Sequence, residues 1–207
     1  MGSAAIRQKA VLLVGPTGSG KTPLGEWLEA HGLWGRRCHH FDFGANLRAV
    51  ASGQVEGFKP EEVLYIQDVV EKGALLEDET FHLALRILRS YMIGRRVHAD
   101  DLLVMNGLPR HVGQAAAIAP CLEFVAIIGL RCDAETVRER LRRNTGGDRA
   151  GRTDDAIALV ERKMAVFSER TKPLLAFYRE RGVPLMPVEV GVNTTPPEVA
   201  EFLEHPV

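Results

Sequence analysis

The residues of this chain that are best suited to chemistry form a glycine-rich stretch close to its start. Residues 15–22 read GPTGSGKT and fit the pattern G-x-x-x-x-G-K-[ST] at every defined position. Glycines let the backbone N–H groups of such a loop surround a phosphate, and the helix that follows adds its positive N-terminal end. Lys21 can then reach the outer phosphates, and the Thr22 hydroxyl can coordinate Mg²⁺. The stretch predicts binding of ATP or a similar triphosphate by Gly15, Pro16, Thr17, Gly18, Ser19, Gly20, Lys21 and Thr22.

A phosphate loop does not identify the reaction, but four later stretches resemble motifs of the adenylate kinase family of nucleoside monophosphate kinases. Residues 43–48 (FGANLR) resemble the family's T-G-D-x-L-R, and residues 73–76 (GALL) resemble its G-x-L-V turn. Residues 106–110 (NGLPR), followed by Gln114, resemble D-G-[FY]-P-R-x-x-x-Q. Residues 151–155 (GRTDD) match the G-R-x-D-D of the family's lid. The resemblance keeps the family's order and spacing and covers most of the chain.

The resemblance implies two substrates, ATP and a nucleoside monophosphate or similar small phosphorylated acceptor, with Mg²⁺ as the cofactor. In the family, the arginines that match Arg48 and Arg110 hold the acceptor phosphate, and the glutamine that matches Gln114 reads the acceptor base. The arginine that matches Arg140 lies near the ATP base. The implied acceptor-binding residues are Phe43, Gly44, Arg48, Leu76, Arg110 and Gln114. The implied catalytic residues are Lys21, Arg110, Arg152 of the lid and Lys163 of a long helix.

Some positions at the expected metal site depart from the family's pattern. Asn106 stands where the family has an aspartate that helps to hold Mg²⁺, and an amide can coordinate the metal, directly or through water, without a charge. We therefore expect Thr22 and Asn106 at the metal. Asp42 ends an apolar run beside the phosphate loop, so it either approaches the metal or acceptor site or caps a loop. Lys163 replaces an arginine, which keeps the charge but loses the forked geometry.

Two phenylalanines stand where the family has smaller residues in the acceptor pocket. Phe43 replaces a threonine, and Phe81 replaces a smaller aliphatic side chain. Their bulk favours a reshaped pocket that stacks an aromatic base, and the alternative is that both fill the hydrophobic core. Three hypotheses follow: a nucleoside monophosphate kinase, a kinase of the same fold acting on another small metabolite, and a nucleotide-sensing module with little transfer activity.

These residues lie far apart in the sequence, so a scaffold must bring them together. Short apolar runs predict buried parallel strands over residues 10–14, 38–43, 101–105, 124–130 and 183–190. Apolar spacing and helix-end residues predict helices over 21–31, 60–72, 77–92, 134–143 and from about 155 to 181, the last with a bend near Pro173. Strands that alternate with helices predict an α/β fold with a central parallel sheet of about five strands. The resemblance makes this the three-layer P-loop kinase fold.

The length of 207 residues predicts a single domain over residues 1–207. The expected parts are a core (1–43, 93–141 and 157–207), a helical acceptor-binding insert (44–92) and a short mobile lid (142–156). Closure of the lid over the substrates would exclude water from the transfer step.

Composition narrows the choice of partners. Lys and Arg number 26 and Asp and Glu 27, so the net charge of −1 disfavours a nucleic-acid binder. The sequence has no apolar run of about 18 residues, the length that spans a membrane, and no secretory signal near its start. The three cysteines form no CxxC pair, which disfavours a disulfide framework or a zinc site. We expect a cytoplasmic enzyme that is a monomer and binds neither nucleic acid nor membrane.

Overall fold

A parallel β-sheet forms the centre of the protein. The computed structural model describes residues 7–148 and 157–204. In this part of the chain, the sheet has the order β2-β3-β1-β4-β5, and all four neighbouring pairs are parallel. Its strands are β1 (Gln8–Val14), β2 (Cys38–Asp42), β3 (Leu102–Asn106), β4 (Leu122–Arg131) and β5 (Leu185–Glu189). The predicted α/β fold with five parallel strands is confirmed.

Both faces of the sheet are covered, which explains why its strands are almost continuously apolar. In β1, the side chains of Leu12 and Val14 point to one hydrophobic cluster, whereas those of Val11 and Leu13 point to another on the opposite face. All four are at most 2% exposed. Because successive side chains of a strand point to opposite faces, the strand contributes to two hydrophobic cores, one on each face of the sheet.

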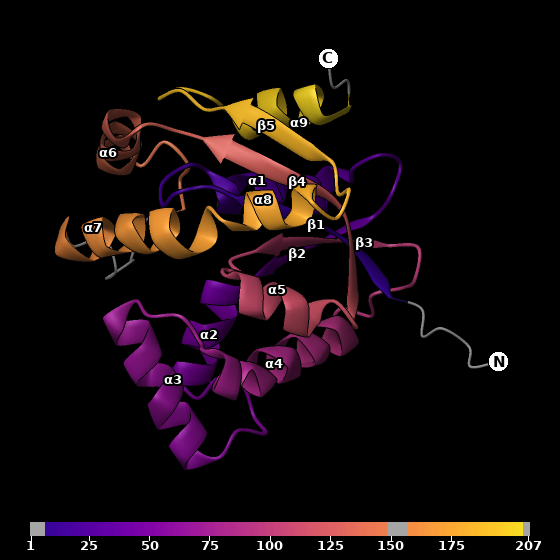
Figure 1. The fold of residues 1–207 in the computed structure, drawn as a ribbon, viewed down its shortest axis with the longest axis vertical. Coiled ribbons are helices and arrows are strands. Elements are labelled where there is room, and N and C mark those ends of the chain that lie inside the picture. Colours follow the sequence, from indigo (N-terminus) through magenta and orange to yellow (C-terminus); the bar gives the residue numbers. More distant parts are fainter. Residues whose placement is uncertain (1–6, 149–156, 205–207) are drawn as a thin grey trace.

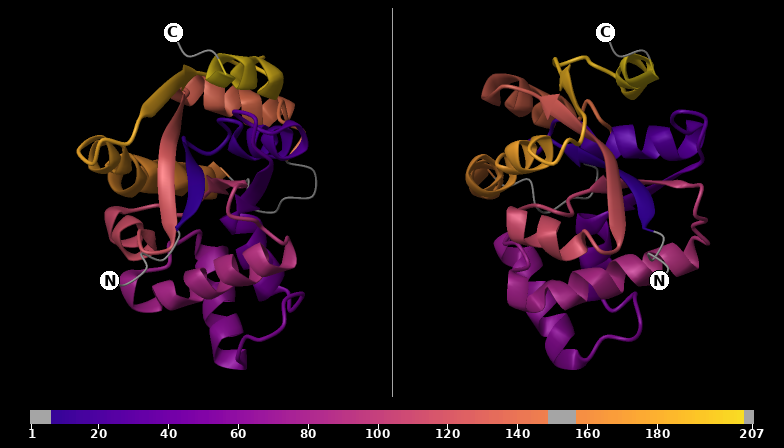
Figure 2. Two further views of the ribbon diagram at one scale, coloured as in Figure 1. Left: turned by 90° about the vertical axis from the view of Figure 1, so that its right-hand side faces the viewer. Right: turned by 45° about the vertical axis from the view of Figure 1, so that its right-hand side comes forward.

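Helices form the two outer layers (Figure 1). Figure 2 shows the sheet between helix α1 on one side and helices α5, α7 and α8 on the other. Below the sheet in Figure 1 lie α2, α3 and α4, in the part of the chain where the acceptor-binding insert is predicted. The helices are α1 (Lys21–His31), α2 (Phe43–Ala51), α3 (Pro60–Lys72), α4 (Phe81–Gly94), α5 (Val112–Ile118), α6 (Ala134–Arg143), α7 (Ile157–Val166), α8 (Leu174–Arg179) and α9 (Pro196–Glu204). None of the described helices is long and apolar enough to cross a membrane.

Helix ends follow the local signals closely, with two differences. Pro60 begins α3, and Gly73 ends it with a φ of 59°, a conformation that suits glycine. The helix expected from residue 77 begins at Phe81, because residues 78–80 form a 3₁₀ turn. The long C-terminal helix is divided by a π-helical turn over residues 167–171, just before Pro173, where a bend was predicted.

The carboxyl ends of β1, β2 and β3 lie at one edge of the sheet. The phosphate-loop stretch follows β1, Asp42 ends β2, and Asn106 ends β3. Asp42 and Asn106 are partners in the parallel register. In open α/β sheets, ligands bind at this edge, so the fold positions the candidate residues together.

Candidate active site

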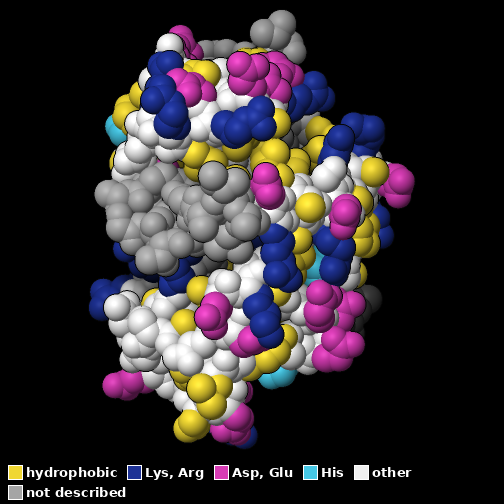
Figure 3. All heavy atoms as spheres, turned by 90° about the vertical axis from the view of Figure 1, so that its left-hand side faces the viewer, with side chains coloured by type: hydrophobic (Ala, Val, Ile, Leu, Met, Phe, Trp, Pro, Cys, Tyr) yellow, Lys and Arg dark blue, Asp and Glu magenta, His cyan; other side chains and the backbone are white. Residues whose placement is uncertain are grey.

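A cleft of about 480 Å³ opens at the carboxyl edge of the sheet. Its walls come from the phosphate loop, the start of α2, the end of α3 with the turn after it, the end of β3, and α6 and α7. Figure 3 shows the surface on this side of the molecule, where Lys and Arg side chains are prominent above and below the middle of the face. The cleft thus lies between the core and the predicted insert, which is where two substrates could meet.

The phosphate loop is closely packed and depends on its glycines. A Cβ atom at Gly15 would lie 2.6 Å from Ser19 Oγ and 2.9 Å from the Leu130 carbonyl oxygen. Gly20, at the start of α1, has a φ of 92°, which a side chain would strain. Lys21 Nζ donates to the carbonyl oxygens of Gly15 (2.8 Å) and Pro16 (2.6 Å), so its ammonium group lies over the loop. Six of the eight predicted ATP-binding residues of this loop line the cleft, and Pro16 and Ser19 do not.

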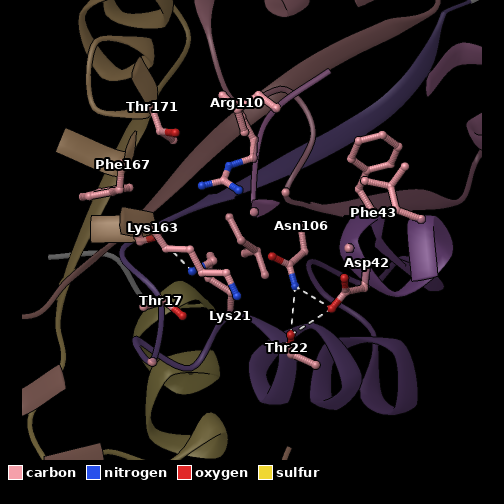
Figure 4. Close-up of a pocket in the computed structure, with 18 of the residues that line it drawn as sticks. Thr17, Lys21, Thr22, Asp42, Phe43, Asn106, Arg110, Lys163, Phe167 and Thr171 are labelled. Carbon is pink, nitrogen blue, oxygen red and sulfur yellow. Dashed lines mark hydrogen bonds between the residues drawn. The ribbon is translucent and has the colours of Figure 1, made fainter. Parts of the chain in front are cut away.

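A hydrogen-bonded network joins Thr22, Asp42 and Asn106 beside the loop (Figure 4). Thr22 Oγ1 donates to Asp42 Oδ2 at 2.9 Å, and Asn106 Nδ2 donates to Thr22 Oγ1 at 3.1 Å and to Asp42 Oδ2 at 3.2 Å. The other oxygen of Asp42, Oδ1, accepts from the Ala45 N–H and caps α2. Asp42 therefore caps a helix, and it also contacts Thr22, a residue that we predict at the metal.

His40 makes a further contact with this network. Its Nε2 lies 3.5 Å from Asn106 Nδ2, and burial lowers the pKa of the ring. A neutral imidazole can accept a hydrogen bond through one ring nitrogen, so the two amide hydrogens of Asn106 have acceptors on both sides.

Two guanidinium groups face the cleft on the insert side. Arg48, on α2, and Arg110, after β3, both line the cleft. Figure 4 shows the Arg110 guanidinium extending toward Lys21 and Lys163. Within the described residues, neither arginine forms an ion pair with a carboxylate, and burial lowers the pKa of Arg110. A partly buried cation without a carboxylate partner points to an anionic ligand.

Sequence comparison places these features in a known family. An adenylate kinase of Parasynechococcus marenigrum (strain WH8102) is 31% identical over 188 residues, which cover 87% of this chain and 90% of that protein. Adenylate kinase isoenzyme 1 of Homo sapiens is 31% identical over 186 residues, covering 86% and 84%. The chain belongs to the adenylate kinase family. It is accordingly a kinase, a phosphotransferase that binds nucleotide.

The chain was also compared with solved structures and with protein-family models. A gluconokinase from Sinorhizobium meliloti 1021 has a TM-score of 0.50 with this chain at 16% identity, and the match covers 98% of this chain and 91% of that one. This likeness shows that the two proteins share a fold, and it does not identify the acceptor of this chain. No protein-family model matches the chain.

Gln114, which matches the glutamine that reads the acceptor base in the family, makes hydrogen bonds to the backbone in this chain. Gln114 is 1% exposed, its Nε2 donates to the Leu76 carbonyl oxygen at 2.8 Å, and its Oε1 accepts from the Arg110 N–H at 2.7 Å. It lines the cleft and at the same time ties α5 to the turn after α3. The predicted contact with an acceptor base stays a prediction.

The two phenylalanines have different surroundings. Phe43 is 5% exposed and lines the cleft with Gly44, Leu76 and other residues of the insert. Phe81 is 3% exposed and packs in the hydrophobic core without lining the cleft. Both phenylalanines belong to the same hydrophobic cluster, and Phe43 also lines the cleft. The core alternative thus fits Phe81, whereas the stacking of an acceptor base on Phe43 stays a prediction.

Arg140 is bound to the backbone on two sides. Its Nε donates to the Gly18 carbonyl oxygen at 3.0 Å, and its Nη1 donates to those of Gly191, Val192 and Thr194 at 2.7–3.1 Å. It is 5% exposed, and burial lowers its pKa. Arg140 therefore braces the phosphate loop against the segment before α9, in addition to any contact with the ATP base.

The remaining predicted residues lie on α7 and on the lid. Lys163 lines the cleft from α7, opposite the phosphate loop. Phe167 and Thr171 line the same wall from the π-helical turn, and neither was predicted as a site residue. A π-helical turn often occurs at functional sites, so such a turn is the signal to look for. Arg152 and most of the predicted lid lie outside the described residues.

Proposed function

We propose that this chain is an ATP-dependent nucleoside monophosphate kinase, which transfers the γ-phosphoryl group of Mg·ATP in line to the acceptor phosphate. The observation that carries the proposal is the pair of guanidinium groups, Arg48 and Arg110, on the insert side of the cleft without carboxylate partners in the described chain. Beside them lies an apolar wall that contains Phe43 and Leu76. A phosphate next to a flat base matches this combination of charge and apolar surface.

Catalysis in this proposal consists of alignment and electrostatic stabilisation. In phosphoryl transfer, negative charge spreads over the equatorial oxygens of the transferring group, so fixed cations around it lower the barrier. Lys21 follows that group from the ATP side, and Arg110 holds the acceptor phosphate in line. Lys163 adds a charge from α7, and Arg152 adds one from the lid. No covalent intermediate with the protein is needed.

The residues beside the loop suit Mg²⁺. Thr22 and Asp42 present a hydroxyl and a carboxylate oxygen at one point, and the NH₂ group of Asn106 is hydrogen-bonded to both. Hard cations such as Mg²⁺ bind oxygen ligands of this kind together with the phosphates of the nucleotide. Within the described residues, there is no group of three His, Cys, Asp or Glu side chains that could hold a metal ion. When bound, Mg²⁺ neutralises charge on the β- and γ-phosphates.

A transfer assay tests the proposal. Mg·ATP is incubated with AMP, GMP, CMP, UMP and their deoxy forms, and a second set contains phosphorylated and carboxylated small metabolites. The Lys21→Met variant is the control, because it keeps the length of the side chain and removes the charge. Formation of one nucleoside diphosphate that depends on Lys21 is the expected result. Transfer only to a compound of the second set, or ATP binding without any transfer, would refute the proposal.

A further inference from the structure

The network beside the phosphate loop contains a carboxylate at a position that the family motifs do not use. The family has its metal-associated aspartate at the end of the third strand, where this chain has Asn106. Here the carboxylate is on Asp42, at the end of the neighbouring strand β2. The two residues are register partners, and Asp42 Oδ2 lies 3.2 Å from Asn106 Nδ2. The charge missing from one strand is therefore present at the paired position of the next.

The hydrogen bonds determine which atoms face one another. An ionised carboxylate only accepts hydrogen bonds, so both groups that touch Asp42 Oδ2 must donate. Thr22 donates its hydroxyl hydrogen, and Asn106 turns its NH₂ rather than its oxygen toward Asp42. Asn106 thus orients the carboxylate and supplies no negative charge. The Thr22 oxygen accepts one hydrogen bond from Asn106 and retains a lone pair for another partner.

The capping role does not use the whole carboxylate. Oδ1 of Asp42 accepts from the Ala45 N–H at 2.9 Å, which is the ordinary N-cap bond. Oδ2 is instead directed toward Thr22, the residue that a phosphate loop offers to Mg²⁺. Asp42 lines the cleft together with Thr22 and Lys21. The capping bond thus leaves Oδ2 free to face Thr22 at the side of the cleft.

We propose that Asp42 is the carboxylate that holds the divalent cation of the bound nucleotide, and that Asn106 is its positioning residue. The metal-associated charge has thus moved from the end of β3 to the end of β2. This inference rests on the proposed use of Mg·ATP, but it does not depend on which acceptor the enzyme phosphorylates.

The test measures metal binding directly. Mn²⁺ is titrated into the full-length protein with a non-hydrolysable ATP analogue, and bound Mn²⁺ is followed by electron paramagnetic resonance. In Asp42→Asn, we expect the affinity for Mn²⁺ to fall by about 10- to 100-fold, the range found when groups around a metal site are removed. Binding of the analogue in the presence of EDTA should not weaken, because no positive charge is lost. Asparagine caps a helix as well as aspartate does, so α2 keeps its cap.

Two further variants make the result specific. Asp133→Asn is the matched control, because Asp133 caps α6 in the same way without lining the cleft, and it should bind Mn²⁺ as the wild type does. The exchange variant D42N/N106D returns the carboxylate to β3 and reverses the hydrogen bond between the two residues. It should recover most of the lost Mn²⁺ affinity.

The outcomes separate this inference from the proposed function. Wild-type Mn²⁺ affinity in Asp42→Asn, or an exchange variant no better than Asp42→Asn, would overturn the role of Asp42. Loss in the single variant with recovery in the exchange variant would support it, even if no nucleoside monophosphate is phosphorylated. In that case only the proposed acceptor would be wrong.

Discussion

Arg140 offers a quantitative test of how the phosphate loop is held. Replacing it with methionine keeps an unbranched side chain in α6 and removes every hydrogen bond to the carbonyl oxygens of Gly18, Gly191, Val192 and Thr194. The two hydrogens of Nη1 serve three of these oxygens, and the Nε hydrogen serves the fourth. We therefore count about three full hydrogen bonds from a charged donor that is 5% exposed.

The expected loss in the free energy of unfolding follows from this count. Hydrogen bonds from a charged donor each contribute about 1.5–3 kcal/mol, but methionine also removes the cost of burying the guanidinium charge, so Arg140→Met should lose about 3–4 kcal/mol. With a urea m-value of about 3 kcal/mol per molar for a chain of this size, the midpoint should fall by about 1 M. Urea unfolding followed by circular dichroism measures this shift without nucleotide.

A matched control lies two residues along the same helix. Arg142 is exposed and pairs with Glu139 on the surface, so Arg142→Met should leave the midpoint nearly unchanged. If Arg140→Met unfolded at the wild-type midpoint but bound ATP weakly, the bracing role would be refuted. Arg140 would then act through the ATP base, as the family resemblance alone implies.

Four other substitutions test neighbouring parts of the structure. A Cβ atom on Gly25 would overlap the ring of His40, so Gly25→Ala should lower the free energy of unfolding by about 1–3 kcal/mol in a urea titration, despite the better helix propensity of alanine. Phe81→Ala should lower the free energy of unfolding by about 3–5 kcal/mol, because it empties a core position. Phe43→Ala should in addition raise the acceptor KM, because Phe43 lines the cleft, and steady-state kinetics of both variants separate the two effects. Arg110→Lys should raise the acceptor KM by about tenfold or more, since lysine keeps the charge without the fork; an unchanged KM would exclude Arg110 from the acceptor site.

The sequence predicts the scaffold well where one physical signal dominates. The central stretches of β1 (residues 10–14) and β4 (residues 124–130) are apolar because helices cover both faces of the sheet, and such runs stand out from any helical pattern. The start and end of α3 are equally clear, because proline and glycine fix their own backbone angles. The helices α2 and α5 are short and mix glycine or alanine with few large apolar residues, so periodicity does not reveal them.

The parts of the site that the sequence does not reveal depend on contacts between distant segments. Asp42 and Asn106 are 64 positions apart, and only the order β2-β3-β1 makes them neighbours. The partners of Arg140 are backbone carbonyl groups, which every residue carries and no motif marks. In the same way, Gln114 matches a base-reading motif, yet its partners in this structure are backbone groups.

The hydrophobic cluster on the insert side of the sheet has a consequence for engineering. Leu47 and Ile66 of the insert share this cluster with Phe41 of β2 and with Leu103 and Met105 of β3. The insert therefore has no separate core and cannot be exchanged as an independent cassette. A chimaera designed to change the acceptor would have to carry the inward-facing residues of β2 and β3 with the graft, or it would leave cavities beneath the new helices.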